Sequence, residues 1–269
     1  MMMTILKDIK EFVKLWKKRL YDEIHSSSIT PILGIIQVGN NPASTKYVNN
    51  KIKDCEEVGI KVLKVSLPED VREPDLLTAV SDTAQNSDGI IVQLPLPPQI
   101  DVTKVKKSIP EEKDVDGFIY DSPYFSCTPL GIMEYLNYCG FNLDGKNVTI
   151  IGRSNIVGKP LARMMTDANA TVTLCHSHTQ NLWPHIQSAD LIVSAVGKAN
   201  FLNCYAIHVP VIDVGINFIE VNGKMKMVGD CYNIENREVT PVPGGVGLLT
   251  RCALLENTWK AANRNKKGE

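Results

Sequence analysis

Tyr47 and Lys51 form a pair of residues whose types and spacing could carry out chemistry. They lie four positions apart in a segment with helical spacing, so both side chains leave one helix face. A lysine that an aromatic ring partly shields from water can exchange a proton near neutral pH, as a general acid or base must. The alternative is an ordinary solvated lysine, which is the commoner case for such a pair seen alone.

Gln93 and a pair of acids could complete such a site. Gln93 follows an apolar, strand-like run and precedes Leu-Pro-Leu-Pro-Pro, so it stands at the carboxyl end of a strand, where parallel sheets bind ligands. Asp114 and Asp116 lie two positions apart in Lys-Asp-Val-Asp-Gly, at a turn expected between two domains. These carboxylates could accept hydrogen bonds from a substrate, or they could cap the turn.

A further stretch, Gly152-Arg-Ser-Asn-Ile-Val-Gly158, has the composition of a phosphate-binding turn between a strand and a helix. Gly152 permits a tight exit from the strand, and Gly158 permits a close approach of the helix, whose N-terminus can hold an anion. Ser154 stands where Gly-x-Gly-x-x-Gly has its second glycine. The next predicted strand ends without an acid for a ribose hydroxyl, whereas Arg153 and Ser177 are available for a 2′-phosphate, which favours NADP. An exposed turn arginine and an ordinary loop serine are the alternative.

Glycines also cluster in Pro241-Val-Pro-Gly-Gly-Val-Gly247, just before an apolar helical segment from Leu248 to Trp259. Glycine-rich backbone at the start of a helix can approach a ligand closely. Proline and glycine also simply make turns, so both interpretations stay open.

The composition argues against several classes of protein and site. The 269 residues carry 29 basic and 30 acidic side chains, so no net basic field favours nucleic acid or a membrane surface. No apolar run approaches the roughly 18 residues of a membrane helix, and we expect a cytoplasmic protein. The seven cysteines include no Cys-x-x-Cys pair, and His176 and His178 have no accompanying ligand pattern, so no metal is expected.

Alternating strands and helices must position these residues in the first half of the chain. β-branched, apolar runs bounded by turn residues alternate with amphipathic patterns, which predicts a parallel sheet with right-handed crossovers. The predicted strands are Ile32–Val38, Ile60–Leu67 and Gly89–Gln93, and the predicted helices are Leu6–Ile24, Pro42–Val58 (closed by Gly59) and Glu73–Gln85.

The second half repeats this alternation. Thr128 and Pro129 are expected to begin a helix as N-cap and first helical residue, and Gly140 to end it. Asn222-Gly223 separates two strand-like runs and predicts a type I′ hairpin. The predicted strands are Val148–Ile151, Thr171–Cys175, Leu191–Val196, Val211–Val214, Phe218–Val221 and Lys224–Val228, with helices from near Gly158 and from Thr179.

These patterns predict two α/β domains that share a cleft. The length agrees, because roughly 150 residues per domain gives about two domains. An N-terminal substrate domain with a parallel sheet would comprise residues 1–124 and be completed by the C-terminal helix, 249–269. A Rossmann-like NADP-binding domain would comprise residues 125–248.

Six segments taken together resemble one enzyme family. They are similar, in content and order, to the bifunctional methylenetetrahydrofolate dehydrogenase/cyclohydrolases of the FolD type, over most of the chain from Pro42 to Thr258. Any one segment would be a weak signal, but six in order are specific. The segments are P-A-S-T-K-Y-V-N-N-K from Pro42, V-Q-L-P-L-P from Val92, K-D-V-D-G-F from Lys113, G-R-S-N-I-V-G-K-P from Gly152, A-T-V-T-L-C-H-S-H-T from Ala170 and P-V-P-G-G-V-G from Pro241.

The resemblance implies two linked reactions on tetrahydrofolate derivatives. The first is the NADP-dependent oxidation of 5,10-methylenetetrahydrofolate to 5,10-methenyltetrahydrofolate. The second is hydrolysis of that product to 10-formyltetrahydrofolate, a step of one-carbon metabolism. The resemblance also implies a homodimer formed through the cofactor domain, with which the apolar hairpin around Phe218–Val228 is compatible.

The same resemblance implies roles for individual residues. Lys51 would transfer protons in the cyclohydrolase step, and Gln93 would hydrogen-bond near it and help to set its protonation state. Tyr47 would pack on the folate ring system, and Asp116 would bind the amino-pyrimidine edge of the pterin. The other implied positions are Val92, Leu94, Pro243, Gly244, Gly245, Val246 and Gly247 for the substrate, and Gly152, Arg153, Ser154, Ser177 and Ile216 for the cofactor.

Three alternatives stay open. A related two-domain NADP enzyme, such as a shikimate-dehydrogenase-like protein, would share the fold but would not need Tyr47, Lys51 and Gln-Leu-Pro-Leu-Pro together. A non-catalytic folate-binding homologue would not need Lys51, Gln93 and Asp116 intact. A homologue that retains only one of the two activities is separable only by assay.

Overall fold

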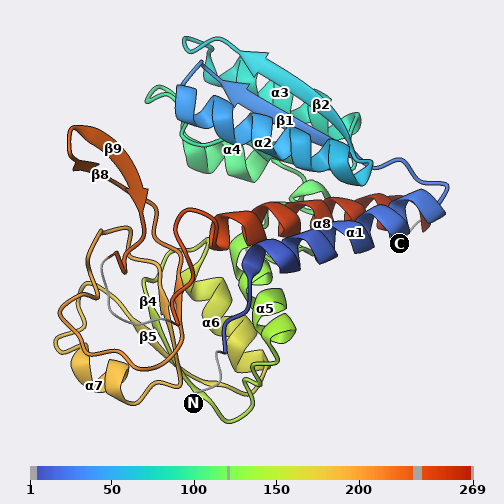
Figure 1. The fold of residues 1–269 in the computed structure, drawn as a ribbon. Helices are drawn as coiled ribbons and strands as arrows, with labels where there is room; N and C mark the ends of the chain where they lie inside the picture. The colour runs from blue at the N-terminus through green and yellow to red at the C-terminus, as the bar shows by residue number, and fades with distance from the viewer. Residues whose placement is uncertain (1–4, 120–121, 233–237, 268–269) are drawn as a thin grey trace. The chain divides into compact units, whose positions relative to one another are not determined.

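The computed structural model divides the chain into two compact units (Figure 1). The structure describes residues 5–119, 122–232 and 238–267. Residues 14–127 and 251–269 form one unit, called the Lys51 unit below, and residues 1–13 and 128–250 form the other, the Gly152 unit.

The N-terminus belongs to a different unit from the one that the sequence predicts. The sequence divides the chain at 124/125 and 248/249 and keeps all of residues 1–124 together, whereas residues 1–13 join the Gly152 unit. Contacts with helix α5 (Cys127–Cys139) explain this difference. Tyr135 Oη donates to the carbonyl of Lys7 at 2.6 Å, and the Phe12 ring stacks on Tyr138 with centroids 4.7 Å apart.

A parallel sheet in the order β2-β1-β3 forms the centre of the Lys51 unit. Both β1 and β3 are buried along nearly their whole length, as expected for strands covered by helices on both faces. The strands are β1 (Ile32–Val38), β2 (Lys61–Leu67) and β3 (Gly89–Val92), close to the predicted runs.

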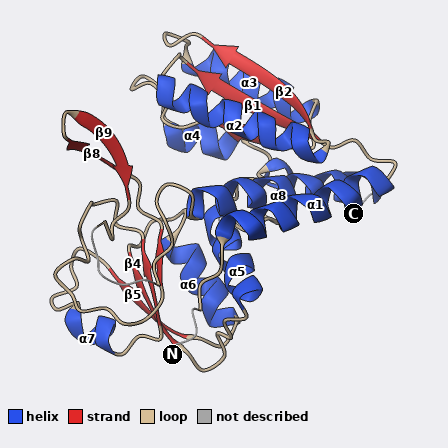
Figure 2. Cartoon of the chain, viewed as in Figure 1, coloured by secondary structure: helices blue, strands red, loops and turns tan. Residues whose placement is uncertain are grey.

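Helices cover both faces of this sheet (Figure 2). On one face, Gln37 of β1 donates from Nε2 to Thr45 Oγ1 of α2 (Pro42–Val58) at 2.8 Å. On the other face, Gly34 lies so close to Thr83 of α3 (Glu73–Gln85) that a Cβ would collide with it. Alternate residues of a strand point to opposite faces, which is why these two β1 residues meet different helices. A short helix, α4 (Val102–Ser108), and a 3₁₀ turn (Glu111–Lys113) complete this part; neither is predicted from the sequence.

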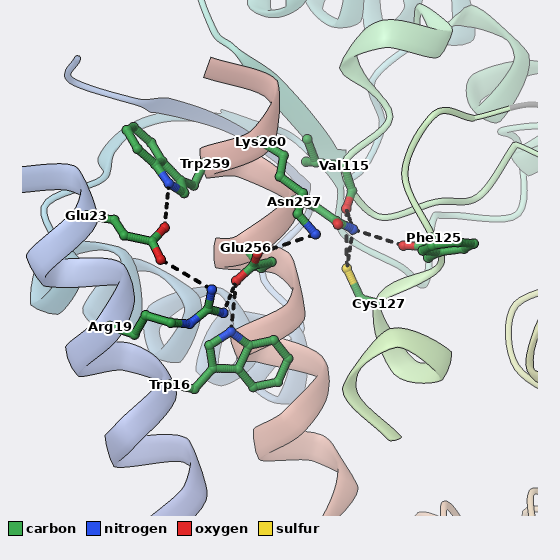
Figure 3. A network of polar contacts seen from close by, with 10 residues as sticks. All are labelled: Trp16, Arg19, Glu23, Val115, Phe125, Cys127, Glu256, Asn257, Trp259 and Lys260. Carbon is green, nitrogen blue, oxygen red and sulfur yellow. Dashed lines mark hydrogen bonds and ion pairs between the residues drawn. The ribbon is translucent and has the colours of Figure 1, made fainter. Parts of the chain in front are cut away.

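Two long helices, α1 (Ile9–Ser26) and α8 (Val246–Lys267), are joined by polar contacts within the Lys51 unit (Figure 3). Trp16 Nε1 and Arg19 both donate to Glu256 Oε2, at 2.9 and 2.6 Å. Trp259 Nε1 donates to Glu23 at 3.0 Å. Burial disfavours the charged form of Glu256, but the hydrogen bond from Trp16 and the nearby positive charges outweigh it and hold the pKa of Glu256 below its ordinary value.

Helix α1 begins at Ile9, three residues after the predicted Leu6. The reason is a cap, because Asp8 Oδ1 accepts hydrogen bonds from the amides of Lys10 and Glu11 at 2.7 and 3.2 Å.

The Gly152 unit is built on a parallel sheet in the order β5-β4-β6-β7. Its core joins residues of the sheet to the segment around Leu202, and its buried members include Ile151, Ile192 and Val211. The strands are β4 (Asn147–Ile151), β5 (Thr171–Cys175), β6 (Leu191–Ser194) and β7 (Val211–Asp213), and the helices are α5, α6 (Gly158–Asp167) and α7 (Trp183–Gln187).

Some boundaries in the Gly152 unit differ from the predicted ones. Thr128 is not an N-cap: α5 already begins at Cys127, and Thr128 Oγ1 pairs with Thr250 Oγ1 at 2.9 Å. Helix α7 begins at Trp183 and not at Thr179, because the Thr179 hydroxyl accepts from the His176 amide at 2.9 Å and so closes a turn.

The predicted hairpin is present as β8 (Asn217–Val221) and β9 (Lys224–Val228). Asn222 and Gly223 have φ angles of 52° and 74°, the left-handed conformations that a type I′ turn requires. Phe218 and Met225 leave 57% and 66% of their surface exposed. No helix in the described parts of the chain is long and apolar enough to cross a membrane.

Candidate active site

Helix α2 positions Lys51, and both of its ends are fixed. The Asn41 side chain accepts from two amides of the first turn at 3.0 and 3.2 Å, and Pro42 occupies the first turn. Gly59 ends the helix with a φ of 88°. Tyr47 lies one turn before Lys51 on the same face, and both residues are partly buried.

The structure brings Lys51 and Gln93 together. Lys51 Nζ donates to Gln93 Oε1 at 3.2 Å, while Gln93 Nε2 donates to the carbonyl of Leu94 at 2.7 Å. The Gln93 amide donates to the carbonyl of Ile36 at 2.8 Å, which continues the pairing of β1 with β3. Since both ends of the side-chain amide are engaged, its oxygen is fixed toward the lysine.

This pair lies where the topology of the sheet favours ligand binding. In the order β2-β1-β3, the chain leaves the middle strand for one side and returns on the other. Open parallel sheets bind ligands outside the carboxyl ends of strands at such a switch point. Gln93 directly follows β3, so the lysine and glutamine meet at this position.

The two acids that follow Lys113 have different surroundings. Asp114 is fully buried, its Oδ2 accepts from the Ile119 amide at 2.8 Å, and burial raises its pKa. Asp116 is only partly buried. Asp114 therefore has the turn-capping role, whereas the partly buried side chain of Asp116 can still reach a ligand.

Asn257 of α8 fixes the backbone on both sides of Asp116 (Figure 3). Its Nδ2 donates to the carbonyls of Val115 and Phe125, each at 2.9 Å, and the side chain is buried. Asn257 is not among the site residues predicted from the sequence. The available signal is an asparagine inside the apolar stretch Leu248–Trp259, where a buried amide needs partners.

Cys127 links Asp116 to Lys51 electrostatically. Burial raises the pKa of the Cys127 thiol, the charge of Asp116 raises it further, and the charge of Lys51 opposes this rise. Both charged groups therefore act on one buried sulfur atom. Lys51, Gln93 and Asp116 all belong to the Lys51 unit, and the structure joins the first two by a hydrogen bond.

Val92 and Leu94 flank Gln93 but differ in exposure. Val92 is 3% exposed and packs in the hydrophobic core with Ile36 and Ile90. A substrate contact at Val92 would therefore come from its main chain. Leu94 is partly buried and leaves side-chain surface for a ligand.

In the Gly152 unit, β4 leads into α6 through the predicted glycine turn. Gly152 has a φ of 117°, and a Cβ there would collide with the carbonyl of Ala195, which follows β6. A Cβ at Gly158 would collide with the carbonyl of Gly152. Both glycines are thus required by close backbone approach at the switch point between β4 and β6. The Ser154 hydroxyl accepts from the Val157 amide at 3.1 Å and shapes the turn.

Three exposed side chains follow strands of the same parallel sheet. Arg153 lies in the turn itself, Ser177 follows β5, and Ile216, 47% exposed, follows β7. Burial lowers the pKa of His176, and the positive charge of Arg153 lowers it further. No acidic residue occurs between Cys175 and Thr179.

The glycine-rich segment Pro243–Gly247 is divided between a loop and a helix. Helix α8 begins at Val246, so Val246 and Gly247 lie in its first turn. Gly244 has a φ of 98°, and a Cβ at Gly245 would collide with the carbonyl of Pro241. The segment belongs to the Gly152 unit, with the candidate cofactor residues, whereas Tyr47, Lys51, Val92, Gln93, Leu94 and Asp116 belong to the Lys51 unit.

The Gly152 turn has the properties of a site for a dinucleotide phosphate. Its backbone leaves no room for side chains at two positions, a helix begins directly after it, and an arginine and a serine are exposed beside it. Among the described residues, no group of three or more His, Cys, Asp or Glu could hold a metal ion. A dinucleotide turn in one α/β unit and a lysine–glutamine pair in another define a dinucleotide-linked α/β enzyme.

The chain belongs to the tetrahydrofolate dehydrogenase/cyclohydrolase family. Residues 3–116 match the catalytic domain of that family, and residues 126–266 match its NAD(P)-binding domain. The predicted family, the α/β fold and the enzyme class are confirmed by these matches and by the relatives described next.

Relatives and solved structures agree over nearly the whole chain. The bifunctional protein FolD of Campylobacter hominis is 43% identical over 278 residues, covering 97% of each chain. The crystal structure of the bifunctional FolD enzyme of Campylobacter jejuni has a TM-score of 0.87 at 41% identity, covering 96% of this chain and 98% of that one. The Trypanosoma brucei dehydrogenase-cyclohydrolase, solved with NADP and an inhibitor, has a TM-score of 0.89 at 30% identity, covering 97% and 98%.

Proposed function

We propose that this chain oxidises 5,10-methylenetetrahydrofolate to 5,10-methenyltetrahydrofolate with NADP and hydrolyses the product to 10-formyltetrahydrofolate. The observation that carries the proposal is the Lys51–Gln93 hydrogen bond in a chain that contains both domains of the family. A homologue with one activity only would not need this pair and the Gly152 turn together.

Lys51 is the proton-transfer residue in this proposal. Hydrolysis forms a bond from a water oxygen to the carbon that bridges N5 and N10 and breaks the bond from that carbon to N5. One proton of the water ends on N5 and the other is released. Lys51 takes and gives these protons through Nζ, and Gln93 Oε1 orients that atom by accepting one of its hydrogen bonds.

Other residues of the Lys51 unit hold the substrate. The Asp116 carboxylate accepts two hydrogen bonds from the amino-pyrimidine edge of the pterin, for which Asn257 fixes the backbone on either side. Tyr47 offers its ring face to the folate ring system. Leu94 and the main chain at Val92 line the same site. Residues 243–247, which belong to the Gly152 unit, contribute glycine-rich backbone for the substrate in this proposal. The Lys51 unit thus carries the folate chemistry.

The Gly152 unit holds the cofactor. Bound NADP supplies the acceptor for the hydride that leaves the methylene carbon. The turn from Gly152 to Ser154 receives the phosphates, and Arg153 with Ser177 binds the 2′-phosphate, which selects NADP over NAD. Ile216 offers an exposed apolar side chain to the nucleotide.

A homodimer that forms through the β8–β9 hairpin is part of the proposal, as is a cytoplasmic location. Phe218 pairs with Met227, and Glu220 pairs with Met225, so these four side chains share one face of the hairpin. The exposure of Phe218 and Met225 supports an interface there. Replacing both residues with aspartate should give a monomer in light scattering after gel filtration. A mass of two chains for that variant would contradict the assignment.

An absorbance assay with methylenetetrahydrofolate tests the activities. The protein is mixed with substrate and either NADP or NAD, and the reaction is stopped with and without acid so that methenyl and formyl products are counted separately. NADP-dependent formation of the formyl product, without accumulation of the methenyl intermediate, is the expected result. A folded protein that binds folate but reduces neither nucleotide would contradict the proposed oxidation.

A further inference from the structure

Two buried carboxylates at the carboxyl edge of the β5-β4-β6-β7 sheet have no role in the chemistry described so far. Asp213 ends β7 and is 2% exposed, and Asp230 follows β9 and is 0% exposed. Buried carboxylates are costly unless hydrogen bonds compensate for the lost water. Their partners therefore indicate what they hold in place.

Asp230 receives an unusually large set of hydrogen bonds. Three come from consecutive amides of the loop after β6, one from the last residue of β6 and one from the first residue of β8. The donors to Oδ2 are Ser194 Oγ at 2.9 Å, the Val196 amide at 2.8 Å and the Gly197 amide at 3.3 Å, and the donors to Oδ1 are the Lys198 amide at 2.9 Å and Asn217 Nδ2 at 3.1 Å. One side chain thus joins two loops of the sheet edge.

Asp213 holds Asp230 in place. Its Oδ1 accepts from the amides of Gly215 and Asp230 at 2.9 and 3.0 Å, and its Oδ2 accepts from the Cys231 amide at 2.8 Å. Burial raises the pKa of Asp213, although these backbone donors oppose the rise. A Cβ at Gly215 would collide with the Asp230 carboxylate. The two acids and the backbone around them are therefore packed without spare room.

One of the two segments that Asp230 joins borders the Gly152 turn, and the other follows a candidate cofactor residue. The loop after β6 begins at Ala195, whose carbonyl lies against Gly152 so closely that a side chain there is excluded. Asn217 directly follows Ile216, a candidate cofactor residue. The Asp230 carboxylate thus connects the backbone beside the phosphate turn to the first residue of the hairpin, directly after Ile216.

We propose that Asp230 is a positioning residue for NADP, because it fixes the loop Ala195–Lys198 and Ile216 in the geometry that receives the nucleotide. This inference rests on the proposed function, which assigns Gly152 and Ile216 to the cofactor. Asp230 acts through the backbone and does not touch the nucleotide itself.

The chemistry requires an acid at position 230. A carboxylate only accepts hydrogen bonds, and all five of its partners are donors. In Asp230→Asn, an NH₂ group faces at least two of these donors and repels them. The loop after β6 or Asn217 then has to move, although the volume of the side chain is unchanged.

The test compares nucleotide binding with an activity that uses the other unit. For full-length Asp230→Asn, calorimetry gives the Kd for NADP, and a nucleotide-free assay gives the rate of methenyltetrahydrofolate hydrolysis. The Kd should rise about tenfold or more, as expected for a loss near 1.4 kcal/mol. Hydrolysis should stay within roughly twofold, because Lys51 lies in the other unit.

Asp190→Asn is the matched control. Asp190 precedes β6 at the opposite edge of the same sheet and pairs with Lys146 at 3.6 Å. Its loss should leave the Kd for NADP within roughly twofold of the wild-type value. Asn217→Ala removes a single partner of Asp230 and provides a milder variant should Asp230→Asn fail to fold. It should raise the Kd about threefold.

Two outcomes would overturn the inference. One is an unchanged Kd in both Asp230→Asn and Asn217→Ala. The other is a fall in hydrolysis that parallels the fall in NADP affinity, since this would mean that Asp230 only supports general stability. Failure of the proposed function would appear differently, as wild-type protein that does not bind NADP.

Discussion

The Lys51 site and the Gly152 site lie at equivalent places in two parallel sheets, yet they are fixed by different means. Each lies at the switch point between neighbouring strands, β1 with β3 and β4 with β6. At the first, hydrogen bonds fix polar side chains and the backbone: Lys51 bonds to Gln93, and Asn257 bonds to the backbone around Asp116. At the second, Arg153 and Ser177 are exposed, and the buried carboxylates Asp213 and Asp230 accept mainly from backbone amides.

The difference follows from what each site has to do. Proton transfer needs one atom within hydrogen-bond reach of the reacting group, so the side chain that carries it must be oriented before the substrate binds. Phosphate binding relies on backbone amides and on the shape of a turn, while charged side chains can adjust around the ligand. The comparison predicts that the two sites can be damaged separately.

Lys51→Met should have the largest effect on activity and should leave the Gly152 site intact. Loss of a general acid or base typically costs about 10²- to 10⁴-fold, so methenyltetrahydrofolate hydrolysis should fall by at least about 100-fold. The Kd for NADP should stay within roughly twofold. Lys53→Met, an exposed lysine of the same helix, is the control. Full hydrolysis by Lys51→Met would remove this lysine from the mechanism.

Gly152→Ala should weaken NADP binding and leave hydrolysis intact, which is the reverse of the result expected for Lys51→Met. Its methyl group would collide with the carbonyl of Ala195, and its φ of 117° is unfavourable for alanine. We expect the Kd for NADP to rise about tenfold or more while hydrolysis without nucleotide is retained. Gly223→Ala is the control, because that glycine has a φ of 74° with open space around it. An equal loss of NADP affinity and of hydrolysis in Gly152→Ala would mean that the two sites are not separable.

Arg153→Ala should weaken binding of the 2′-phosphate within the Gly152 site. A charge-assisted hydrogen bond contributes about 1.5–3 kcal/mol, so the Kd for NADP should rise by about 10- to 100-fold. Affinity for NAD, which lacks the 2′-phosphate, should change little. Binding of both nucleotides is measured by calorimetry. A parallel loss of NAD affinity would assign Arg153 to the shared pyrophosphate instead.

Glu256→Gln should have the smallest effect, on stability alone. The folded pKa of Glu256 is below its ordinary value, so its contribution is present at neutral pH and is lost as the pH falls through the folded pKa. A loss of about 1 kcal/mol corresponds to a Tm lower by roughly 2–4 °C at pH 7. The difference between variant and wild type should shrink on acidification in a calorimetric scan. A difference that grows at low pH would contradict the assigned sign.

Local signals in the sequence predict most of the fold. Helix α2 has the predicted bounds because proline and glycine mark its ends, and the hairpin follows from Asn222-Gly223. Helix α4 is missed because seven residues with few apolar positions show no clear periodicity. The N-cap assigned to Thr128 is wrong because its hydroxyl pairs with Thr250, a contact that no local pattern reveals.

The residues of the site, too, are predicted from the sequence only where local signals mark them. Lys51 and Gln93 are adjacent to strand and helix signals, and their contact at 3.2 Å agrees with their predicted proximity. Asn257 and Asp230 are absent from the predicted site because their roles depend on partners far along the chain, 142 residues away for Val115 and 36 for Ser194. Tertiary contacts of this kind become visible only in the folded chain.

The position of α8 after most residues of the Gly152 unit has a consequence for biosynthesis. Domains generally fold as units while the chain leaves the ribosome from its N-terminus. The Lys51 unit draws Glu256 and Asn257 from the last helix, although most of its residues are made first. That unit therefore stays incomplete until residues 128–250 and α8 have been made, and only then do Asp116 and α1 gain these partners. A nascent or prematurely terminated chain would expose an unfinished surface to chaperones and proteases.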